Sequence, residues 1–197
     1  MSDTRNVIVT IGREYGSGGR EIGEKLAQRL GINFYDRNLI ELAAKRSGLD
    51  ASSVAHSDEK APGLFVSGYT PTVSDQLFFA QSDLIRSLAD NESFVIVGRC
   101  ANSVLDGYCD TFDVYIYAPL EDRIERVKER YRLDSAEKAR KEIARVDKIR
   151  KTYYQYYTEY RWGSKEGFDM LLNSSLLGID GTVDVLESVV RKNFDIK

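Results

Sequence analysis

Four glycines in eight positions follow a short run of strand-forming residues near the start of the chain. Residues 7–11 are all β-branched, residues 12–19 hold the glycines, and apolar residues then recur at helical spacing from Ile22 to Leu30. A strand, a glycine loop and a helix in this order aim backbone N–H groups and a helix N-terminus at an anion. The pattern predicts a phosphate-binding loop, and a glycine-rich turn that holds no ligand is the alternative.

This loop differs from two common nucleotide-binding motifs. The Walker A pattern ends in Gly-Lys-Ser/Thr, whereas here the corresponding residues are Gly18, Gly19, Arg20 and Glu21. The dinucleotide pattern needs G-x-G-x-x-G spacing and an acidic residue after a second strand, and the glycines here do not give that spacing. Arg13 and Arg20 flank the loop, so either could supply the positive charge that a lysine supplies elsewhere.

Strand-like and helix-like segments alternate along the chain. We expect strands at residues 7–11, 32–35, 94–97, 112–117 and 168–172, with helices of ten or more residues between and after them. This alternation predicts βαβ units, and therefore an α/β fold of three layers with a parallel sheet between two layers of helices.

Charged residues follow three of the expected strands. Arg13 comes after the first strand, Asp36 and Arg37 after the second, and Arg99 after the third. Ligands of open parallel sheets bind beyond the carboxyl ends of the strands. Because three separate strand ends carry such residues, we expect them to converge on one binding crevice.

The composition favours a single globular domain. The chain has 197 residues, 42% of them hydrophobic and 30% charged, and its net charge of −3 argues against general nucleic-acid binding. No apolar run reaches the roughly 18 residues of a membrane span, and the polar N-terminal residues predict no secretory signal. Cys100 and Cys109 form no C-x-x-C motif, and His56 is the single histidine. We therefore expect a cytoplasmic protein without a disulfide framework or a multi-histidine metal site.

Two further segments allow functional and structural interpretations. Residues 50–72 are rich in Ser, Gly, Pro and Asp, which is typical of a binding lobe or of a plain surface loop. Residues 135–157 form an expected helix, on which Lys138, Lys141, Arg145 and Lys148 make a basic stripe. The stripe could be a solvated face, or a lid whose arginines, Arg145 and Arg150, close over phosphates.

A dense aromatic run follows the stripe, at residues 153–157, Tyr160 and Trp162. Core packing or contact with a second copy of the chain would explain it. Stacking against a nucleotide base is the functional alternative. A homo-oligomer is therefore a possible state of the protein.

Five segments taken together resemble the cytidylate kinase-like family, namely residues 12–23, 34–37, 95–99, 116–123 and 171–181. The resemblance runs in order along nearly the whole chain. It implies one P-loop kinase-like domain over residues 1–197, with a nucleoside-monophosphate (NMP) lobe at about 50–90 and a helical lid at about 132–160. It also implies transfer of the γ-phosphate of ATP to CMP or dCMP, with Mg²⁺ as the metal ion.

The resemblance also assigns roles to individual residues, although it identifies no metal ligand. The ATP-binding residues would be Gly16, Ser17, Gly18, Gly19, Arg20 and Glu21. The residues that bind the phosphate acceptor would be Asp36, Arg37 and Arg99. The catalytic residues would be Arg20, Arg145, Asp147 and Arg150.

Three positions differ from the kinase pattern. The loop lysine of these kinases falls on Gly19, the loop hydroxyl on Glu21, and the aspartate after the acceptor arginine on Cys100. Arg20 could replace the lysine charge. Three functions therefore stay open: a small-molecule or nucleotide kinase, a nucleotide-binding regulator that has lost phosphoryl transfer, and an unrelated phosphate-binding or oligomerisation module.

Overall fold

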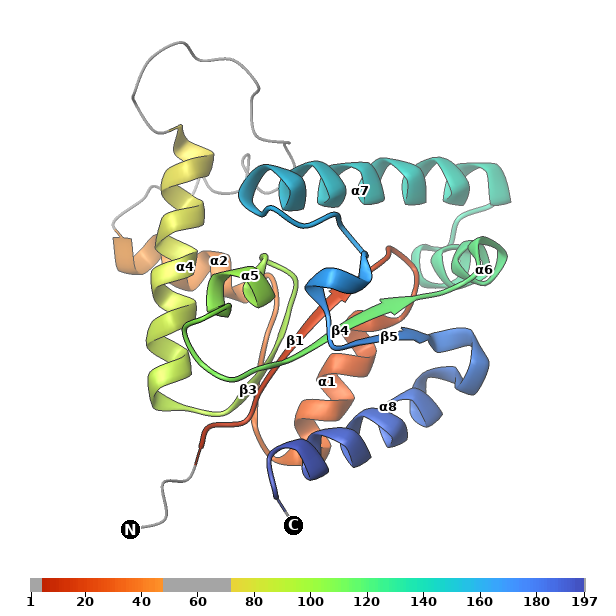
Figure 1. Ribbon diagram of the computed structural model, residues 1–197. Coiled ribbons are helices and arrows are strands. Elements are labelled where there is room, and N and C mark those ends of the chain that lie inside the picture. Colours follow the sequence, from red (N-terminus) through yellow and green to blue (C-terminus); the bar gives the residue numbers. More distant parts are fainter. Residues whose placement is uncertain (1–4, 48–71, 197) are drawn as a thin grey trace.

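The computed structural model describes residues 5–47 and 72–196, which contain a five-stranded, fully parallel sheet (Figure 1). The strands are β1 (Ile8–Arg13), β2 (Asn33–Tyr35), β3 (Phe94–Val97), β4 (Phe112–Tyr117) and β5 (Met170–Asn173). Their order across the sheet is β2-β3-β1-β4-β5. The predicted α/β fold with a parallel sheet is confirmed.

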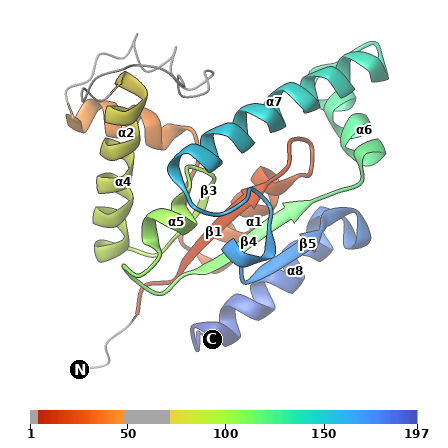
Figure 2. The same ribbon diagram turned by 45° about the horizontal axis from the view of Figure 1, so that its top comes forward.

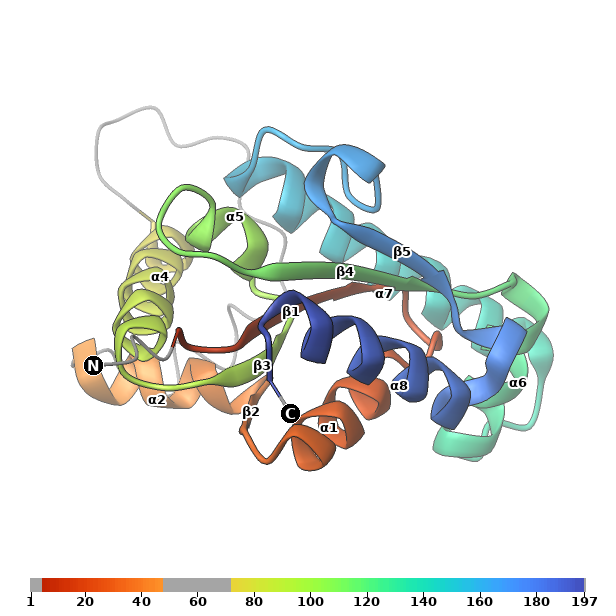
Figure 3. The same ribbon diagram turned by 60° about the horizontal axis from the view of Figure 1, so that its bottom comes forward.

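Two layers of helices cover the sheet (Figure 3). The helices are α1 (Gly19–Leu30), α2 (Asn38–Ser47), α4 (Val73–Asn91), α5 (Ala101–Leu105), α6 (Leu120–Tyr131), α7 (Ala136–Tyr157) and α8 (Ser174–Asn193), and η1 (Lys165–Gly167) is a 3₁₀ turn. One core cluster lies between the sheet and α1 with α8. A second lies between the opposite face and α2, α4 and α5.

The alternation of side chains along β1 explains why both faces are covered. Val9 and Ile11 point into the first cluster, whereas Ile8 points into the second. All four residues of β3 are buried. Central parallel strands read as continuous apolar runs because neither face meets water.

Helices α6 and α7 extend beyond the sheet and share a small core of their own, formed by Ile124, Val127, Ala139 and Ile143. Figures 1 and 2 show α7 lying across the carboxyl ends of the strands. The Ser135 side chain accepts a hydrogen bond from the Lys138 N–H and so fixes the start of α7. Lys138 and Lys141 pair with acidic residues on the exposed side, so this half of the basic stripe is a solvated face.

Two local features differ from the sequence expectation. The five residues of α5 form a short helix that the periodicity did not indicate. Helix α8 begins at Ser174, ahead of the kink at Gly178, where φ is 69°. The Asn173 side chain accepts a hydrogen bond from the Ser175 N–H, so a local cap starts a helical turn that the later glycines concealed.

The expected NMP lobe, at about 50–90, lies partly outside the described residues. Its described part begins at Thr72, which forms a capping box with Asp75 at the start of α4. The division into core, lobe and lid therefore stays a prediction. Within residues 5–47 and 72–196, no helix combines the length and apolar character needed to cross a membrane.

Asp113 in β4 makes the stability of the fold depend on pH. Burial raises the pKa of this carboxyl to about 6, although hydrogen bonds from Thr10 and Thr111 lower it. The pKa of Asp113 is higher in the folded protein than in the unfolded chain, so binding of a proton to Asp113 stabilises the fold. This contribution to the free energy of unfolding is fully present below the ordinary pKa of 3.8 and is lost as the pH rises to about 6.

We therefore predict that Asp113→Asn raises the free energy of unfolding at pH 7 by about 1–3 kcal/mol. At pH 4 the variant and the unmodified protein should differ little. Urea unfolding at pH 4, 5, 6 and 7 measures this, with the exposed Asp83→Asn as a charge-matched control. Profiles that stay parallel from pH 4 to 7 would contradict the prediction.

Candidate functional site

The glycine loop runs from the end of β1 to the first turn of α1. Gly16 and Gly18 have φ values of 82° and 81°, in the left-handed region that glycine adopts without strain. The Ser17 hydroxyl donates a hydrogen bond to the Glu14 carbonyl oxygen at 2.9 Å, and the Ser174 hydroxyl donates to the Ser17 carbonyl oxygen at 2.6 Å. The N-cap residue Gly18 offers no side chain to α1, and the Gly19 N–H makes a long hydrogen bond of 3.4 Å to Ser17 Oγ. The next amides of the first turn, those of Arg20 and Glu21, are therefore the ones best placed for an anion.

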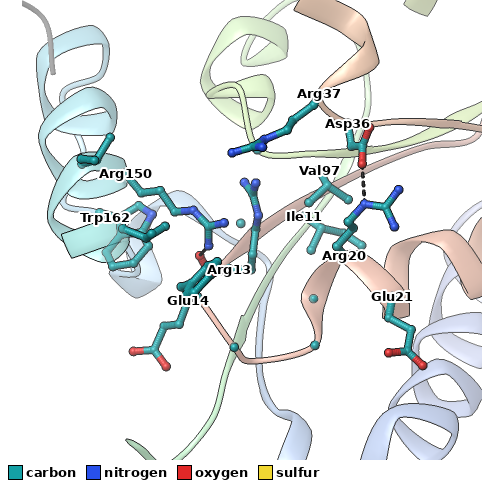
Figure 4. Close-up of a pocket in the computed structure, with 18 of the residues that line it drawn as sticks. Ile11, Arg13, Glu14, Arg20, Glu21, Asp36, Arg37, Val97, Arg150 and Trp162 are labelled. Atoms are coloured by element: carbon teal, nitrogen blue, oxygen red, sulfur yellow. Dashed lines mark hydrogen bonds and ion pairs between the residues drawn. The ribbon is translucent and has the colours of Figure 1, made fainter. Parts of the chain in front are cut away.

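A cavity of about 980 Å³ opens over this loop (Figure 4). Its size suits a small-molecule ligand such as a nucleotide. The arginines that line it are Arg13, Arg20, Arg37, Arg99, Arg126, Arg130, Arg145 and Arg150. The carboxylates that line it are Glu14, Glu21, Asp36, Glu129 and Glu142. Positive side chains exceed negative ones here, although the whole chain carries a net charge of −3, so the cavity favours a polyanion.

Three arginines, from β1, from the turn after β2 and from α7, meet at the centre of the cavity. Figure 4 shows the guanidinium groups of Arg13, Arg37 and Arg150 pointing toward one another. Burial, and then the charges of Arg150 and Arg99, lower the pKa of Arg13, while the carboxylate of Asp36 raises it. Cations held together in this way repel one another, so an anion bound between them would stabilise the arrangement.

Arg99 reaches the cavity through an unusual turn at the end of β3. Gly98, Arg99 and Cys100 have consecutive positive φ values of 80°, 64° and 54°. Each non-glycine residue in this region costs about 1 kcal/mol, and such strain is typical of functional sites. Burial raises the pKa of the Cys100 thiol to about 12, so the position of the kinase aspartate carries no charge here.

Most of the residues singled out from the sequence lie around this one cavity. Those that line it are Gly16, Gly18, Gly19, Arg20, Glu21, Asp36, Arg37, Arg99, Arg145 and Arg150. Ser17 is fully buried behind the loop, and Asp147 does not line the cavity either. The arrangement brings the side chains together, while their individual roles stay predictions.

Arg20 and Arg145 already have acidic partners. The Arg20 Nε donates to Asp36 Oδ2 at 2.5 Å, and its Nη1 donates to Glu24 at 2.9 Å. Burial raises the pKa of Asp36, but the hydrogen bond from Arg20 acts in the opposite direction, and the pKa of Asp36 is lowered. Arg145 forms a two-pronged pair with Glu142, with both distances 2.8 Å. Both arginines line the cavity with much of their charge compensated.

Asp147 ties α7 to the glycine loop. Its Oδ1 accepts the Tyr15 N–H at 2.7 Å, and its Oδ2 accepts Arg123 Nη1 at 2.6 Å. Arg123 is only 8% exposed and lies 3.5 Å from Glu14, whose carboxylate also accepts the Ala118 N–H. Through these contacts Asp147 joins α6, α7 and the loop, and the catalytic role expected for it stays a prediction.

Other contacts at the loop come from arginines of α7 and α6, and the α6 arginines were not singled out from the sequence. Arg150 Nη1 donates to the Arg13 carbonyl oxygen at 3.3 Å. Arg126 donates to the Gly16 carbonyl oxygen at 3.4 Å and to the Ser174 hydroxyl at 3.3 Å. Arg123, Arg126 and Arg130 are spaced i, i+3, i+7 along α6, and this helical spacing is the signal that could have found them.

The aromatic run divides into several roles. Tyr154 is 5% exposed, and its hydroxyl accepts a hydrogen bond from Asn102 at 2.8 Å. Tyr157 stacks on Phe78 with ring centroids 3.9 Å apart. These contacts pack both tyrosines against the rest of the protein. Tyr153, Tyr154 and Trp162 form part of the cavity wall.

The site suits a nucleotide better than a resident metal ion. The described residues contain no cluster of three or more His, Cys, Asp or Glu that could hold a metal. Near the loop, Glu14 and Asp147 contact Arg123, and Glu21 pairs with Lys25 at 3.4 Å. Mg²⁺ in nucleotide sites usually takes most of its ligands from phosphates and water, which agrees with this donor set.

Comparisons with known proteins agree with this geometry. A model of the cytidylate kinase-like family matches residues 8–176. The chain is 25% identical over 194 residues to a protein named cytidylate kinase from Methanopyrus kandleri, covering 94% of this chain and 93% of that protein.

Solved structures show the same fold. An uncharacterized protein from Eubacterium ventriosum is 27% identical, with a TM-score of 0.75 over 94% of this chain and 98% of that one. Shikimate kinase from Acinetobacter baumannii, in complex with shikimate, is 15% identical, with a TM-score of 0.54 over 97% and 96% of the two chains. The second likeness is one of fold alone, and it confirms the predicted kinase-type α/β architecture.

We predict that Asp147→Ala lowers the free energy of unfolding by about 2–4 kcal/mol, because it leaves the buried Arg123 charge without its close partner. Chemical denaturation measures the change. As a control, Asp134→Ala breaks an exposed pair with Lys138 on the same helix and should leave stability nearly unchanged. Equal effects of the two substitutions would contradict the role given to Asp147.

Proposed function

This chain belongs to the cytidylate kinase-like family, and we propose that it transfers the γ-phosphate of ATP to CMP, dCMP or a related small acceptor. The observation that carries the proposal is the convergence of the glycine loop with arginines from three strand ends and α7 on one cavity. A polyphosphate and a second phosphate could be held there side by side. Family membership supports a nucleoside monophosphate kinase-like activity, and the choice of acceptor is our proposal.

In this proposal the donor phosphates lie on the loop amides of residues 16–21. Arg37 and Arg99 hold the phosphate of the acceptor, and Arg145 and Arg150 approach from α7. Phosphoryl transfer needs little covalent help from the protein, because rate comes from positioning and from neutralising charge on the phosphate oxygens. Arginine suits this task because its planar fork matches two phosphate oxygens at once.

Mg²⁺, when bound with ATP, would neutralise further phosphate charge and help to orient the donor. Glu21 is the cavity-lining carboxylate of α1 nearest in sequence to the loop. Figure 4 shows its side chain directed away from the arginine centre. The protein's own contribution is therefore mainly cationic.

The aromatic wall offers a place for the acceptor base. Tyr153 and Trp162 line the cavity, and Trp162 packs edge-on against Tyr115 with ring centroids 5.6 Å apart. A base that stacks on such a wall gains affinity without being read by hydrogen bonds. We therefore expect the site to accept cytosine and other pyrimidine bases. A change in the position of the acceptor phosphate should be tolerated less readily.

A second candidate function is a nucleotide-binding regulator that no longer transfers phosphate. Two observations favour it: Gly19 stands at the position of the kinase lysine, and Arg20 and Arg145 already pair with carboxylates. Such a protein would bind ATP in the same cavity and leave it intact.

The test is an ADP-release assay on highly purified protein with ATP and Mg²⁺, using CMP, dCMP, UMP, AMP and shikimate as acceptors. Phosphorus NMR of the product mixture identifies any phosphorylated acceptor. We expect turnover with CMP or dCMP. ATP binding with no turnover on any acceptor would favour the regulator, and the absence of ATP binding would reject both functions.

For the kinase, we predict that Arg99→Ala raises KM for CMP by about 10- to 100-fold, the loss expected for a charge-assisted contact. The Kd for ATP should change less than about threefold. Arg86→Ala removes the same charge from α4, away from the cavity, and should alter neither value. An unchanged KM for CMP in Arg99→Ala would remove Arg99 from the acceptor site.

A further inference from the structure

The position of the kinase lysine is sterically blocked in this protein. An ideal Cβ atom built on Gly19 would lie 2.7 Å from the Cβ of Arg13 and 3.2 Å from its Cγ. Contacts below 3.0 Å are essentially never seen for real Cβ atoms. The stem of Arg13 therefore fills the space that any side chain at position 19 would need.

A second glycine makes room for the other end of the same side chain. A Cβ atom on Gly98, at the end of β3, would lie 2.0 Å from Arg13 Nη1. Gly98 also has a φ of 80°. Any other residue there would therefore meet both the Arg13 side chain and an unfavourable backbone conformation. Arg13 thus extends from the start of α1 to the end of β3, in space kept open by Gly19 and Gly98.

The charge of Arg13 is less compensated than that of Arg20. Arg20 has a side chain 46% exposed and contacts two carboxylates. No ion pair of Arg13 occurs within residues 5–47 and 72–196, and its strongest charged neighbours are Arg150 and Arg99. A guanidinium crowded by other cations gains more from an incoming anion than one that already has its counter-ions.

We propose that Arg13, rather than Arg20, supplies the charged contact to the phosphate groups of a nucleoside triphosphate that a lysine supplies in Walker-type loops. Gly19 and Gly98 are required because they hold the space for its side chain. The inference rests on the proposed function only in requiring that ATP binds in this cavity.

Calorimetric titration of ATP and of CMP into Arg13→Ala tests the contact. We expect the Kd for ATP to rise at least tenfold and the Kd for CMP to stay within threefold. Arg13→Lys, which keeps the charge, should recover at least half of the lost affinity on a logarithmic scale. Arg86→Ala is the matched control, and circular dichroism with thermal melting verifies that each variant is folded.

The outcomes distinguish failure of the proposed function from failure of the Arg13 contact. If the unmodified protein binds no ATP, the proposed function fails. If it binds ATP and folded Arg13→Ala binds ATP equally well, only the assignment of Arg13 is overturned. A loss of CMP affinity as large as the loss of ATP affinity would also overturn it, because Arg13 would then belong to the acceptor site.

A double-mutant cycle tests whether Gly19 is required because it leaves space for Arg13. Its readout is the dependence of the Gly19→Ala effect on Arg13, which a purely structural role of Gly19 would not produce. Gly19→Ala adds one methyl group against Arg13 and should weaken ATP binding at least fivefold. In the Arg13→Gly background, where the conflicting stem is absent, the same substitution should change the Kd for ATP less than twofold. Equal losses in the two backgrounds would show that Gly19 acts independently of Arg13 and would overturn the proposal.

Discussion

Repulsion between arginine side chains is the constraint on which this structure depends. The guanidinium groups of Arg13, Arg37 and Arg150 face one another at the centre of the cavity (Figure 4), and burial with the charges of Arg150 and Arg99 lowers the pKa of Arg13. Such an arrangement persists only if the surrounding structure holds each side chain in place. The hydrophobic layers on both faces of the sheet supply that rigidity.

The carboxylates near the cavity serve mainly to fix its cationic walls. Asp147 accepts hydrogen bonds from the loop amide of Tyr15 and from Arg123, so α6, α7 and the loop are joined by one ionic group. Asp36 performs a comparable task between α1 and the start of α2 through Arg20. The acidic side chains thus contribute to the site through geometry, while the positive charge remains in excess at its centre.

The fold and the location of the site could be predicted because both depend on periodic patterns. The continuous apolar run of β3 and the strand-loop-helix order at residues 7–30 specify a parallel sheet with a loop at its carboxyl edge. The pairing of individual charges could not be predicted in this way. Arg20 is close in sequence to the loop, but its contact with Asp36 depends on how α2 is placed.

The close packing around Arg13 could not be predicted from the sequence either. Position 19 reads as a lost lysine in the sequence, and only the three-dimensional arrangement reveals that the stem of Arg13 occupies its space. The roles of α7 are likewise divided by tertiary packing. Lys138 and Lys141 are solvated, whereas Arg145 and Arg150 line the cavity, although all four belong to the same helix.

The internal pairing of Arg145 with Glu142 has a consequence for how a ligand would enter. Because Asp147 and Arg150 anchor the middle of α7 to the loop and to β1, admission of a phosphate does not require the helix to swing as a whole. Rotation of the Arg145 side chain could instead replace its contact with Glu142 by a contact with the phosphate. The Glu142 carboxylate and the incoming oxyanion would then compete for Arg145. Such competition favours the binding of highly charged ligands over that of singly charged metabolites.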